Sequence, residues 1–264
     1  MMILDEILHR KRLEVLSMRG FDRQRLQRVH QARPPRDFTA ALRRNGTSII
    51  AEIKAKSPTV RSFERANDPV CLGENYERYG ARALSVVVDA KDFGGSPGIV
   101  DRVANAPTIT LPVLYKDFVV DERQIYEARA NGADAVLLIA RAVRGETLSQ
   151  FVDLAHRLGM AALVEAGDED DILTALMTGT LLIGVNNRDL ATQQIDLENS
   201  IRLAPLIPEH ITRISESGIS SRNNIRDVEK AGYDAVLIGE SLLTAPQLDE
   251  FMASLLVRDT KGSS

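Results

Sequence analysis

The sequence has few of the residues that build disulfide frameworks and metal centres. Its 264 residues include one cysteine, Cys71, so no disulfide can form within the chain, and a reducing, cytoplasmic setting fits this composition. The histidines are scattered, and none has the spacing of metal ligands, so we expect no metal site. They are His9, His30, His156 and His210.

Long apolar runs and an excess of positive charge are also missing. No segment approaches the roughly 18 consecutive apolar residues of a membrane span, so we expect no membrane partner. Residues 1–19 lack the apolar run of a signal peptide and are expected to form an amphipathic helix. The 33 basic and 37 acidic residues leave a net charge of −4, which argues against nucleic acid as a partner.

The rest of the composition is that of a globular chain with a sizeable core, at 44% hydrophobic and 27% charged residues. Eight short apolar runs typical of strands recur from Thr47 onward. Between them lie amphipathic segments typical of helices, most of which end in glycine, as expected just past a helix C-terminus. The eight runs are "TSIIAEI", "ALSVVVD", "LPVLYKD", "AVLLIAR", "AALVEA", "LLIGVNN", "ITRISES" and "AVLIGES".

This alternation predicts βαβ units and a parallel sheet. Eight such units that close on themselves form a (β/α)8 TIM barrel, an α/β fold whose usual length of about 250 residues suits this chain. The similarity of "GADAVLLI" at Gly132 to "GYDAVLIG" at Gly232 favours the half-barrel repetition of a closed ring. An open doubly wound sheet is the alternative, although no G-x-G-x-x-G motif follows any run.

The first 46 residues have a different character. We expect a single domain, 1–264, in which an N-terminal helical extension (1–46) packs across one mouth of a barrel (47–264). "DFTAALRRNG" predicts a short helix that Gly46 ends. The extension is either a helical cover with one solvated face or a lid over a site. Its first helix is predicted from an apolar stripe made of Ile3, Ile7, Leu8, Leu13 and Leu16.

Charged and polar residues stand at the C-terminal ends of five of the apolar runs. In "IIAEIKAKSP", Glu52 and Lys54 are two residues apart, so their side chains share one face of the strand. In a barrel these ends gather at one mouth, where the active sites of this fold lie. Converging charges need partners or a charged ligand, and such crowding shifts pKa values. The set is Glu52, Lys54, Lys116, Glu165, Asn186, Arg188 and Glu216.

Glycines follow the last two runs, in "SESGI" (215–219) and "IGES" (238–241). The loops after strands seven and eight often bind phosphate in such barrels, through backbone N–H groups at the start of a short helix. Gly218 and Gly239 permit close approach of the backbone to a ligand. We therefore expect a phosphorylated small molecule as the partner.

The sequence resembles the indole-3-glycerol phosphate synthase family, whose members close the indole ring in tryptophan biosynthesis. The resemblance covers nearly the whole chain and is carried by "ILDEILHRKR", "AEIKAKSP", "LPVLYKDF", "QIYEARANGADAVLLI", "LGMAALVEA", "IGVNNRDL", "SESGI" and "AVLIGESLL". It implies a carboxy-lyase that converts 1-(2-carboxyphenylamino)-1-deoxyribulose 5-phosphate into indole-3-glycerol phosphate, carbon dioxide and water. It also implies that the reaction needs no metal and no cofactor.

By this resemblance, Lys116 is the general acid that protonates the ketone while the anthranilate ring carbon attacks it. Glu165 assists the later proton transfers, and Lys54 lies near the substrate carboxylate or the leaving hydroxyl. The groups that hold and polarise the reacting atoms are Glu52, Asn186 and Glu216. The substrate-binding residues, with two phenylalanines beside the aromatic ring, are Ser57, Phe93, Phe118, Arg188, Ser217, Gly218, Gly239, Glu240 and Ser241. Nearby cations would lower the pKa of Lys116 and nearby carboxylates would raise it, and the sequence leaves this balance open.

Two stretches depart from the family pattern. After "KSP" the family usually has Ser-x-Gly, whereas this chain has "TVRS", Thr59 to Ser62, and Val88 stands where a threonine is common. Neither change removes a predicted catalytic group. Both bear on closure of the first βα loop, substrate affinity and substrate choice.

Other functions remain as alternatives. Phosphoribosylanthranilate isomerase, another phosphate-binding barrel, needs a cysteine base at the end of strand one, but Cys71 falls in a predicted helix. A Schiff-base aldolase that uses Lys116 is a second alternative. A catalytically silent or substrate-shifted barrel of the same family is the third. We expect a monomer or a weak homo-oligomer.

Overall fold

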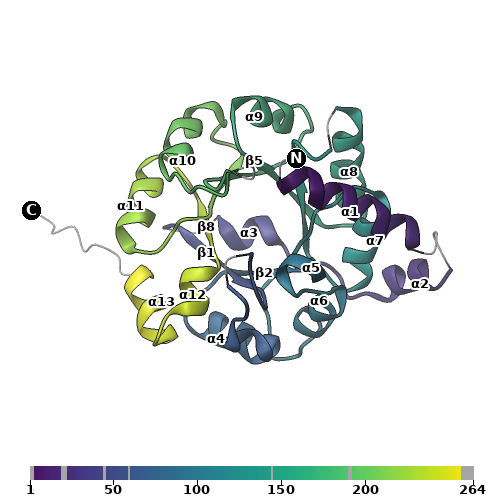
Figure 1. Ribbon diagram of the computed structural model, residues 1–264, viewed down its shortest axis with the longest axis horizontal. Coiled ribbons are helices and arrows are strands. Elements are labelled where there is room, and N and C mark those ends of the chain that lie inside the picture. The colour runs from purple at the N-terminus through teal and green to yellow at the C-terminus, as the bar shows by residue number, and fades with distance from the viewer. Residues whose placement is uncertain are drawn as a thin grey trace, which may run out of the picture.

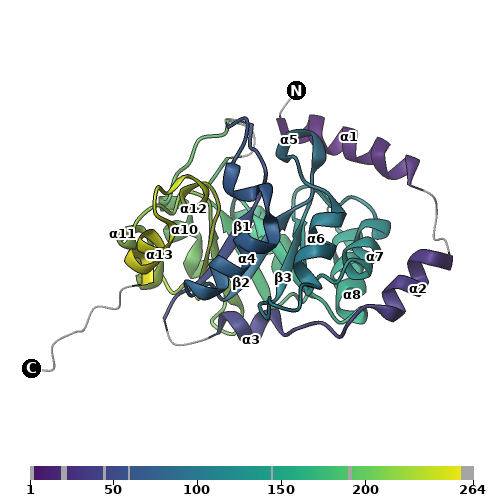
Figure 2. The ribbon, with the colours of Figure 1, turned by 90° about the horizontal axis from the view of Figure 1, so that it is seen from below.

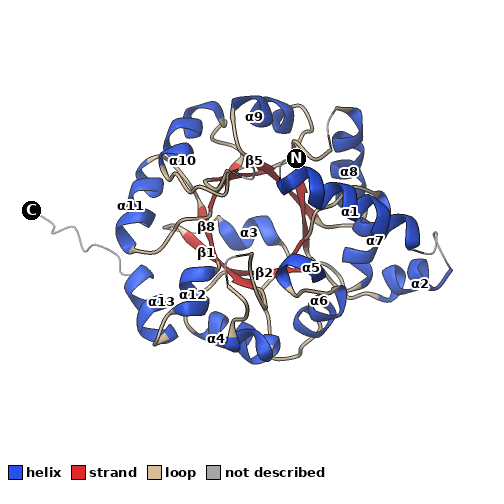
Figure 3. Ribbon diagram, in the orientation of Figure 1, coloured by secondary structure: helices blue, strands red, loops and turns tan. Residues whose placement is uncertain are grey.

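The computed structural model describes residues 3–18, 23–43, 46–58, 60–143, 145–189 and 192–256. Within them, eight parallel strands pair in chain order and the last pairs with the first, which closes the barrel. Figures 1 and 3 look down this barrel and show the helices as a ring outside the strands. The prediction of a (β/α)8 barrel is confirmed. The strands are β1 (Ser48–Ile53), β2 (Ala83–Val87), β3 (Val113–Lys116), β4 (Ala135–Ile139), β5 (Ala161–Ala166), β6 (Leu182–Asn186), β7 (Thr212–Glu216) and β8 (Ala235–Ile238).

Several of the helices outside the barrel begin at residues whose side chains cap them. Asp68 accepts a hydrogen bond from the backbone N–H of Cys71, and Asp121 with Gln124 forms a capping box. None of the helices in the described ranges is both long and apolar enough to cross a bilayer. The elements after β1 are η1 (Glu64–Asn67), α4 (Pro69–Arg78), α5 (Ala90–Phe93), α6 (Pro97–Ala104), α7 (Glu122–Ala130), α8 (Glu146–Arg157), α9 (Glu169–Leu176), α10 (Glu198–Leu203), η2 (Ala204–Leu206), α11 (Arg222–Lys230), α12 (Glu240–Thr244) and α13 (Leu248–Leu256).

The near-repeat before β4 and β8 is explained by how the preceding helices end. Gly132 follows α7 with φ +83°, and Gly232 follows α11 with φ +92°. Glycine adopts this left-handed conformation without the steric penalty of a Cβ atom. The two helices therefore end in the same way just before two buried strands on opposite sides of the ring.

The register of the strands brings their polar ends to a common level. Lys116 on β3 lies beside Val87 on β2, and Asn186 on β6 lies beside Glu216 on β7. The strands are otherwise almost wholly buried and apolar, as expected for parallel strands that are covered on both faces. The polar residues at the C-terminal ends are therefore exceptions that all belong to one mouth.

The N-terminal helices occupy three different places (Figure 2). Helix α1 (Ile3–Ser17) lies over one side of the mouth at the C-terminal ends of the strands, with its N-terminal end at the rim, and α2 (Arg23–Gln31) packs against α7. Helix α3 (Phe38–Leu42) lies under the opposite end, where the hydroxyl of Ser48, the first residue of β1, donates to the carbonyl of Leu42 at 2.9 Å. The expectation that these helices pack together across one mouth is wrong for α2 and α3.

The buried face of α1 also differs from the predicted stripe. Leu13 and Leu16 are 55% and 73% exposed. The inward positions include a charged residue, Lys11, because the barrel presents the carboxylates of Asp89 and Asp117 at that point. Of the predicted stripe, Leu8 is buried and Ile7 lines the cavity, but Leu13 and Leu16 face solvent. The buried residues of α1 are Leu4, Leu8, Lys11 and Val15.

Candidate active site

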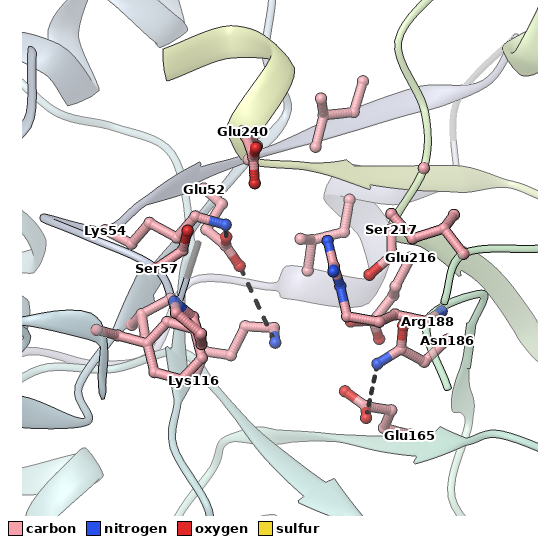
Figure 4. Close-up of a pocket in the computed structure, with 18 of the residues that line it drawn as sticks. Glu52, Lys54, Ser57, Lys116, Glu165, Asn186, Arg188, Glu216, Ser217 and Glu240 are labelled. Atoms are coloured by element: carbon pink, nitrogen blue, oxygen red, sulfur yellow. Dashed lines mark hydrogen bonds and ion pairs between the residues drawn. The ribbon is translucent and has the colours of Figure 1, made fainter. Parts of the chain in front are cut away.

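A cavity of about 540 Å³ opens at the mouth of the barrel where the strands end (Figure 4). All fifteen residues that the sequence singled out line this cavity, although they come from seven of the eight strand ends and the loops beyond them. They are Glu52, Lys54, Ser57, Phe93, Lys116, Phe118, Glu165, Asn186, Arg188, Glu216, Ser217, Gly218, Gly239, Glu240 and Ser241.

Glu52 is the centre of one charged group. Its Oε1 lies 2.9 Å from Nζ of Lys54, its neighbour on the same strand face, and its Oε2 lies 4.0 Å from Nζ of Lys116. Burial alone would raise the pKa of Glu52, but the charges of Lys54 and Lys116 bring it below its ordinary value. Glu52 is therefore an ionised carboxylate shared by two lysines.

Lys116 projects into the cavity between Glu52 and Glu165 (Figure 4). Burial alone would lower its pKa, but the carboxylates of Glu165, Glu52 and Glu216 outweigh this effect and raise it. Lys116 is therefore protonated at neutral pH. This charge state suits a proton donor and disfavours the neutral amine that attack on a carbonyl would require.

A second polar group links β5 to β6. The side-chain amide of Asn186 donates to Oε1 of Glu165 at 3.1 Å, and its Oδ1 accepts from the backbone N–H of Arg188 at 2.9 Å. Glu165 is 3% exposed, so its orientation is set by protein groups rather than by solvent. The amide of Asn186 thus holds the carboxylate of Glu165 at the wall of the cavity.

Glu216 is buried beside these groups and differs from them in charge state. Burial, with the charge of Glu165 nearby, raises its pKa to about 8. Its Oε1 accepts no hydrogen bond from the described residues. Glu216 is therefore a neutral carboxylic acid below that pH, able to donate a hydrogen bond.

Two glycines make room for these carboxylates. A Cβ atom on Gly239 would lie 2.4 Å from Oε1 of Glu52, and one on Gly184 would lie 2.2 Å from Oε1 of Glu216. The sequence suggested only a phosphate role for Gly239 and did not single out Gly184. The sequence did contain an indication of the role of Gly184, since a glycine inside an apolar run such as "LLIGVNN" can mark the close approach of another group.

The opposite wall of the cavity is apolar. The rings of Phe93 and Phe118 lie 6.3 Å apart between centroids and are tilted by 34°. Leu4 and Ile7 of α1 and Ile195 of the loop after β6 also line the cavity. Sequence reasoning missed these three, because nothing local shows where α1 or that loop lies relative to the strand ends.

The loops after β7 and β8 form the third side. Ser217 and Gly218 both have positive φ, +67° and +84°. The hydroxyl of Ser241, in the first turn of α12, donates to the carbonyl of Ile219 at 2.9 Å and joins the two loops. Arg188 extends into the cavity between Glu52 and Ser217 (Figure 4). Backbone N–H groups at the start of α12 and a cation are thus available to an anion here.

The departures from the family pattern lie at the edge of the site. Thr59 lies outside the described residues, while Ser57 and Val60 on either side exchange backbone hydrogen bonds of 2.9 and 3.1 Å. Val88 is buried, and its N–H donates to the carbonyl of Lys116. Cys71 is exposed on α4, away from the cavity, which excludes it as the base that an isomerase would need.

Fold and site together define a class. A closed (β/α)8 barrel whose mouth combines half-buried lysines, buried carboxylates, an apolar wall and two glycine-containing loops is an acid–base enzyme for a small molecule with aromatic and anionic parts.

Comparison with known proteins gives the family. Residues 4–255 match the family described as "Indole-3-glycerol phosphate synthase". The chain is 42% identical over 254 residues to the indole-3-glycerol phosphate synthase of Chloroherpeton thalassium, which covers 94% of this chain and 97% of that one. It is 43% identical over 274 residues to the enzyme of the same name from a Roseiflexus species, which covers 99% of each. The chain belongs to the indole-3-glycerol phosphate synthase family.

A solved structure supports the fold alone. A cube-shaped porous cage designed by fusing symmetric oligomeric domains superposes with a TM-score of 0.55 at 16% identity, over 79% of this chain and 70% of that one. The family membership confirms the expected function, a decarboxylating lyase of tryptophan biosynthesis.

Proposed function

We propose that the chain converts 1-(2-carboxyphenylamino)-1-deoxyribulose 5-phosphate into indole-3-glycerol phosphate, and that Lys116 is the proton donor. The observation that carries this proposal is a protonated lysine at the centre of the cavity, within reach of three carboxylates and between an apolar wall and an anion-binding side. The aromatic ring lies against Phe93 and Phe118, and the phosphate lies at the loops after β7 and β8.

The first bond forms between the anthranilate ring carbon and the ketone carbon. As the ring carbon attacks, the π electrons of the ketone C=O bond move onto the oxygen, and Lys116 protonates that oxygen, so that no alkoxide accumulates. The carboxylate then leaves as carbon dioxide, and its bonding electrons restore the aromatic ring. The apolar wall favours this step, because a carboxylate is less well solvated there than neutral carbon dioxide.

The second half of the reaction removes water and completes the indole. The hydroxyl leaves as water after it receives a proton, and a carbon-bound proton is removed as the double bond forms. Glu165, an acceptor oriented by Asn186, takes the carbon-bound proton. Two protons enter and one leaves over the whole sequence, so each turnover consumes one proton.

Lys54 and Arg188 supply the remaining positive charge. Lys54 is fixed by Glu52 and faces the substrate carboxylate or the leaving hydroxyl. Arg188 lies toward the phosphate side, where the N–H groups of the loops containing Gly218 and Gly239 complete the anion site. Ser57, Glu240 and Ser241 frame the ends of the substrate.

A turnover assay tests this proposal directly. The chain contains no tryptophan, so indole fluorescence in a reaction mixture reports the product without a tryptophan background from the protein. We expect fluorescence to rise with substrate and one molecule of carbon dioxide to be released per product. A silent or substrate-shifted barrel would give no signal, and a Schiff-base aldolase would be trapped by borohydride in the presence of substrate. We further propose that the enzyme acts in the cytoplasm, which its single, free cysteine supports, and that it is a monomer or weak homo-oligomer.

A further inference from the structure

Lys11 of α1 is buried between two carboxylates that belong to different loops of the barrel mouth. Its Nζ lies 2.8 Å from Oδ1 of Asp117 and 3.1 Å from Oδ2 of Asp89. The side chains of Asp89 and Asp117 are 0% and 5% exposed, so this contact is shielded from solvent. Burial alone would lower the pKa of Lys11, but Asp117 and Asp89 raise it, so the lysine is charged at neutral pH.

Each of the two carboxylates is anchored in a loop that carries one wall of the cavity. Asp89 caps α5 by accepting from the N–H of Asp92 at 2.8 Å, and α5 ends in Phe93. Asp117 stands between Lys116 and Phe118, and its Oδ2 accepts from the side-chain amide of Gln124 at 3.1 Å. The two aromatic side chains are therefore attached to the two loops that Lys11 connects.

Helix α1 provides a third part of the same wall. Leu4 and Ile7, which line the cavity, lie seven and four residues before Lys11 and thus on the same side of the helix. Arg10 also contacts Asp89, together with Asp92 on the α5 side. Within the described residues, Lys11 is the side chain of α1 that forms an ion pair with the loop after β3.

We propose that Lys11 is a positioning residue for the aromatic ring of the substrate, because it joins α1, the Phe93 loop and the Phe118 loop into one wall. The inference deepens the function proposed above and rests on it. The predicted acid, Lys116, is held separately by strand β3 and by Glu52. Loss of Lys11 therefore weakens binding of the ring more than it slows proton transfer.

The test measures binding apart from chemistry. Indole-3-glycerol phosphate is titrated with enzyme, and its indole emission gives Kd directly because the chain has no tryptophan. For Lys11→Met we expect Kd of the product and KM of the substrate to rise about tenfold or more, since loss of about 1.4 kcal/mol of contact with a displaced apolar wall corresponds to a factor of ten in Kd. We expect kcat to stay within about threefold of wild type.

Two matched variants separate positioning from general effects of charge. Lys11→Arg keeps the cation and should hold Kd within about threefold of wild type. Arg12→Met removes an exposed basic residue one position along the same helix and should leave Kd unchanged. If Lys11→Met does not fold, Asp117→Asn decides instead: it keeps the hydrogen bond from Gln124 and the contact of Lys11 with Asp89, and Kd should still rise.

The measurements distinguish a failure of the proposed function from a failure of the proposed role of Lys11. A wild-type protein that neither turns over the substrate nor binds the product refutes the proposed function. A functional wild type with folded Lys11→Met or Asp117→Asn variants of unchanged Kd refutes the role of Lys11 alone. A defect of Lys11→Met confined to kcat also refutes it, because binding of the indole ring of the product would then be intact.

Discussion

Replacing Lys116 by methionine removes the predicted proton donor while keeping roughly the same length of side chain. General acid catalysis typically contributes about 10² to 10⁴ in rate, which corresponds to about 3 to 5 kcal/mol of transition-state stabilisation. We therefore expect kcat of Lys116→Met to fall at least a hundredfold. KM should change much less, because the proposed phosphate contacts at Gly218 and Gly239 do not involve this lysine.

The structure also indicates that the folded state should tolerate this change. Removing one member of a buried ion pair typically costs about 3–5 kcal/mol because an uncompensated charge remains. Glu52, however, keeps Lys54 at 2.9 Å, and Glu165 keeps the hydrogen bond from Asn186 at 3.1 Å. Glu216, with a pKa of about 8, is already neutral at pH 7. The loss of stability should therefore fall below that range, and thermal unfolding measured alongside kcat will show whether the variant is folded.

Lys54→Met is the matched comparison. It removes the 2.9 Å partner of Glu52 and the proposed counter-ion of the substrate carboxylate, so kcat, KM and stability should all be affected. The assay for both variants is the appearance of indole fluorescence from the carboxyphenylamino substrate. Near-normal kcat in folded Lys116→Met would refute the reasoning, and Lys54 would then be the first candidate for the acid.

Three further predictions concern other parts of the site. Ser217→Asp places a carboxylate beside the proposed phosphate site, at a residue whose φ of +67° aspartate tolerates. Because the carboxylate repels the phosphate, KM should rise about tenfold or more. An unchanged KM would place the phosphate elsewhere. Gly184→Ala should lower both kcat and Tm by displacing Glu216. Gly98→Ala, whose Cβ would meet nothing closer than 3.8 Å, should lower neither. Equal behaviour of the two variants would show that Glu216 does not require a glycine at position 184. The side chain of Glu216 keeps its proton to about pH 8 in the folded protein but loses it near pH 4.5 in the unfolded chain. Between these two pH values the folded state binds more protons than the unfolded state. The free energy of unfolding should therefore fall as pH rises, by up to about 1.4 kcal/mol per pH unit. Glu216→Gln should remove that component from denaturation curves recorded across this range, and an unaltered slope would show that Glu216 is ionised in the folded protein.

Local patterns in the sequence are sufficient to predict the strands and the identity of most groups at the mouth. Strand alternation places Glu52 and Lys54 on one face, and the C-terminal ends of parallel strands meet at one mouth, so residues far apart in the chain can be grouped from the sequence alone. Gly132 and Gly232 likewise mark helix ends, because the left-handed backbone conformation at these points favours glycine. These features depend on a few neighbouring residues and on the geometry of the strand and the helix.

The tertiary structure alone decides the properties that depend on distances between separate elements. The pKa of Lys116 is raised because three carboxylates from β1, β5 and β7 together outweigh burial, a balance that only their positions determine. The need for glycine at position 184 arises from the carboxylate of Glu216, which the neighbouring strand places against Gly184. Lys11 lies in a charged segment that no local pattern marks as buried. Its ion pairs with Asp89 and Asp117 form only because α1 packs at the barrel mouth. Sequence specifies which groups are present and in what local order, whereas charge state, clearance and pairing follow from how the elements pack.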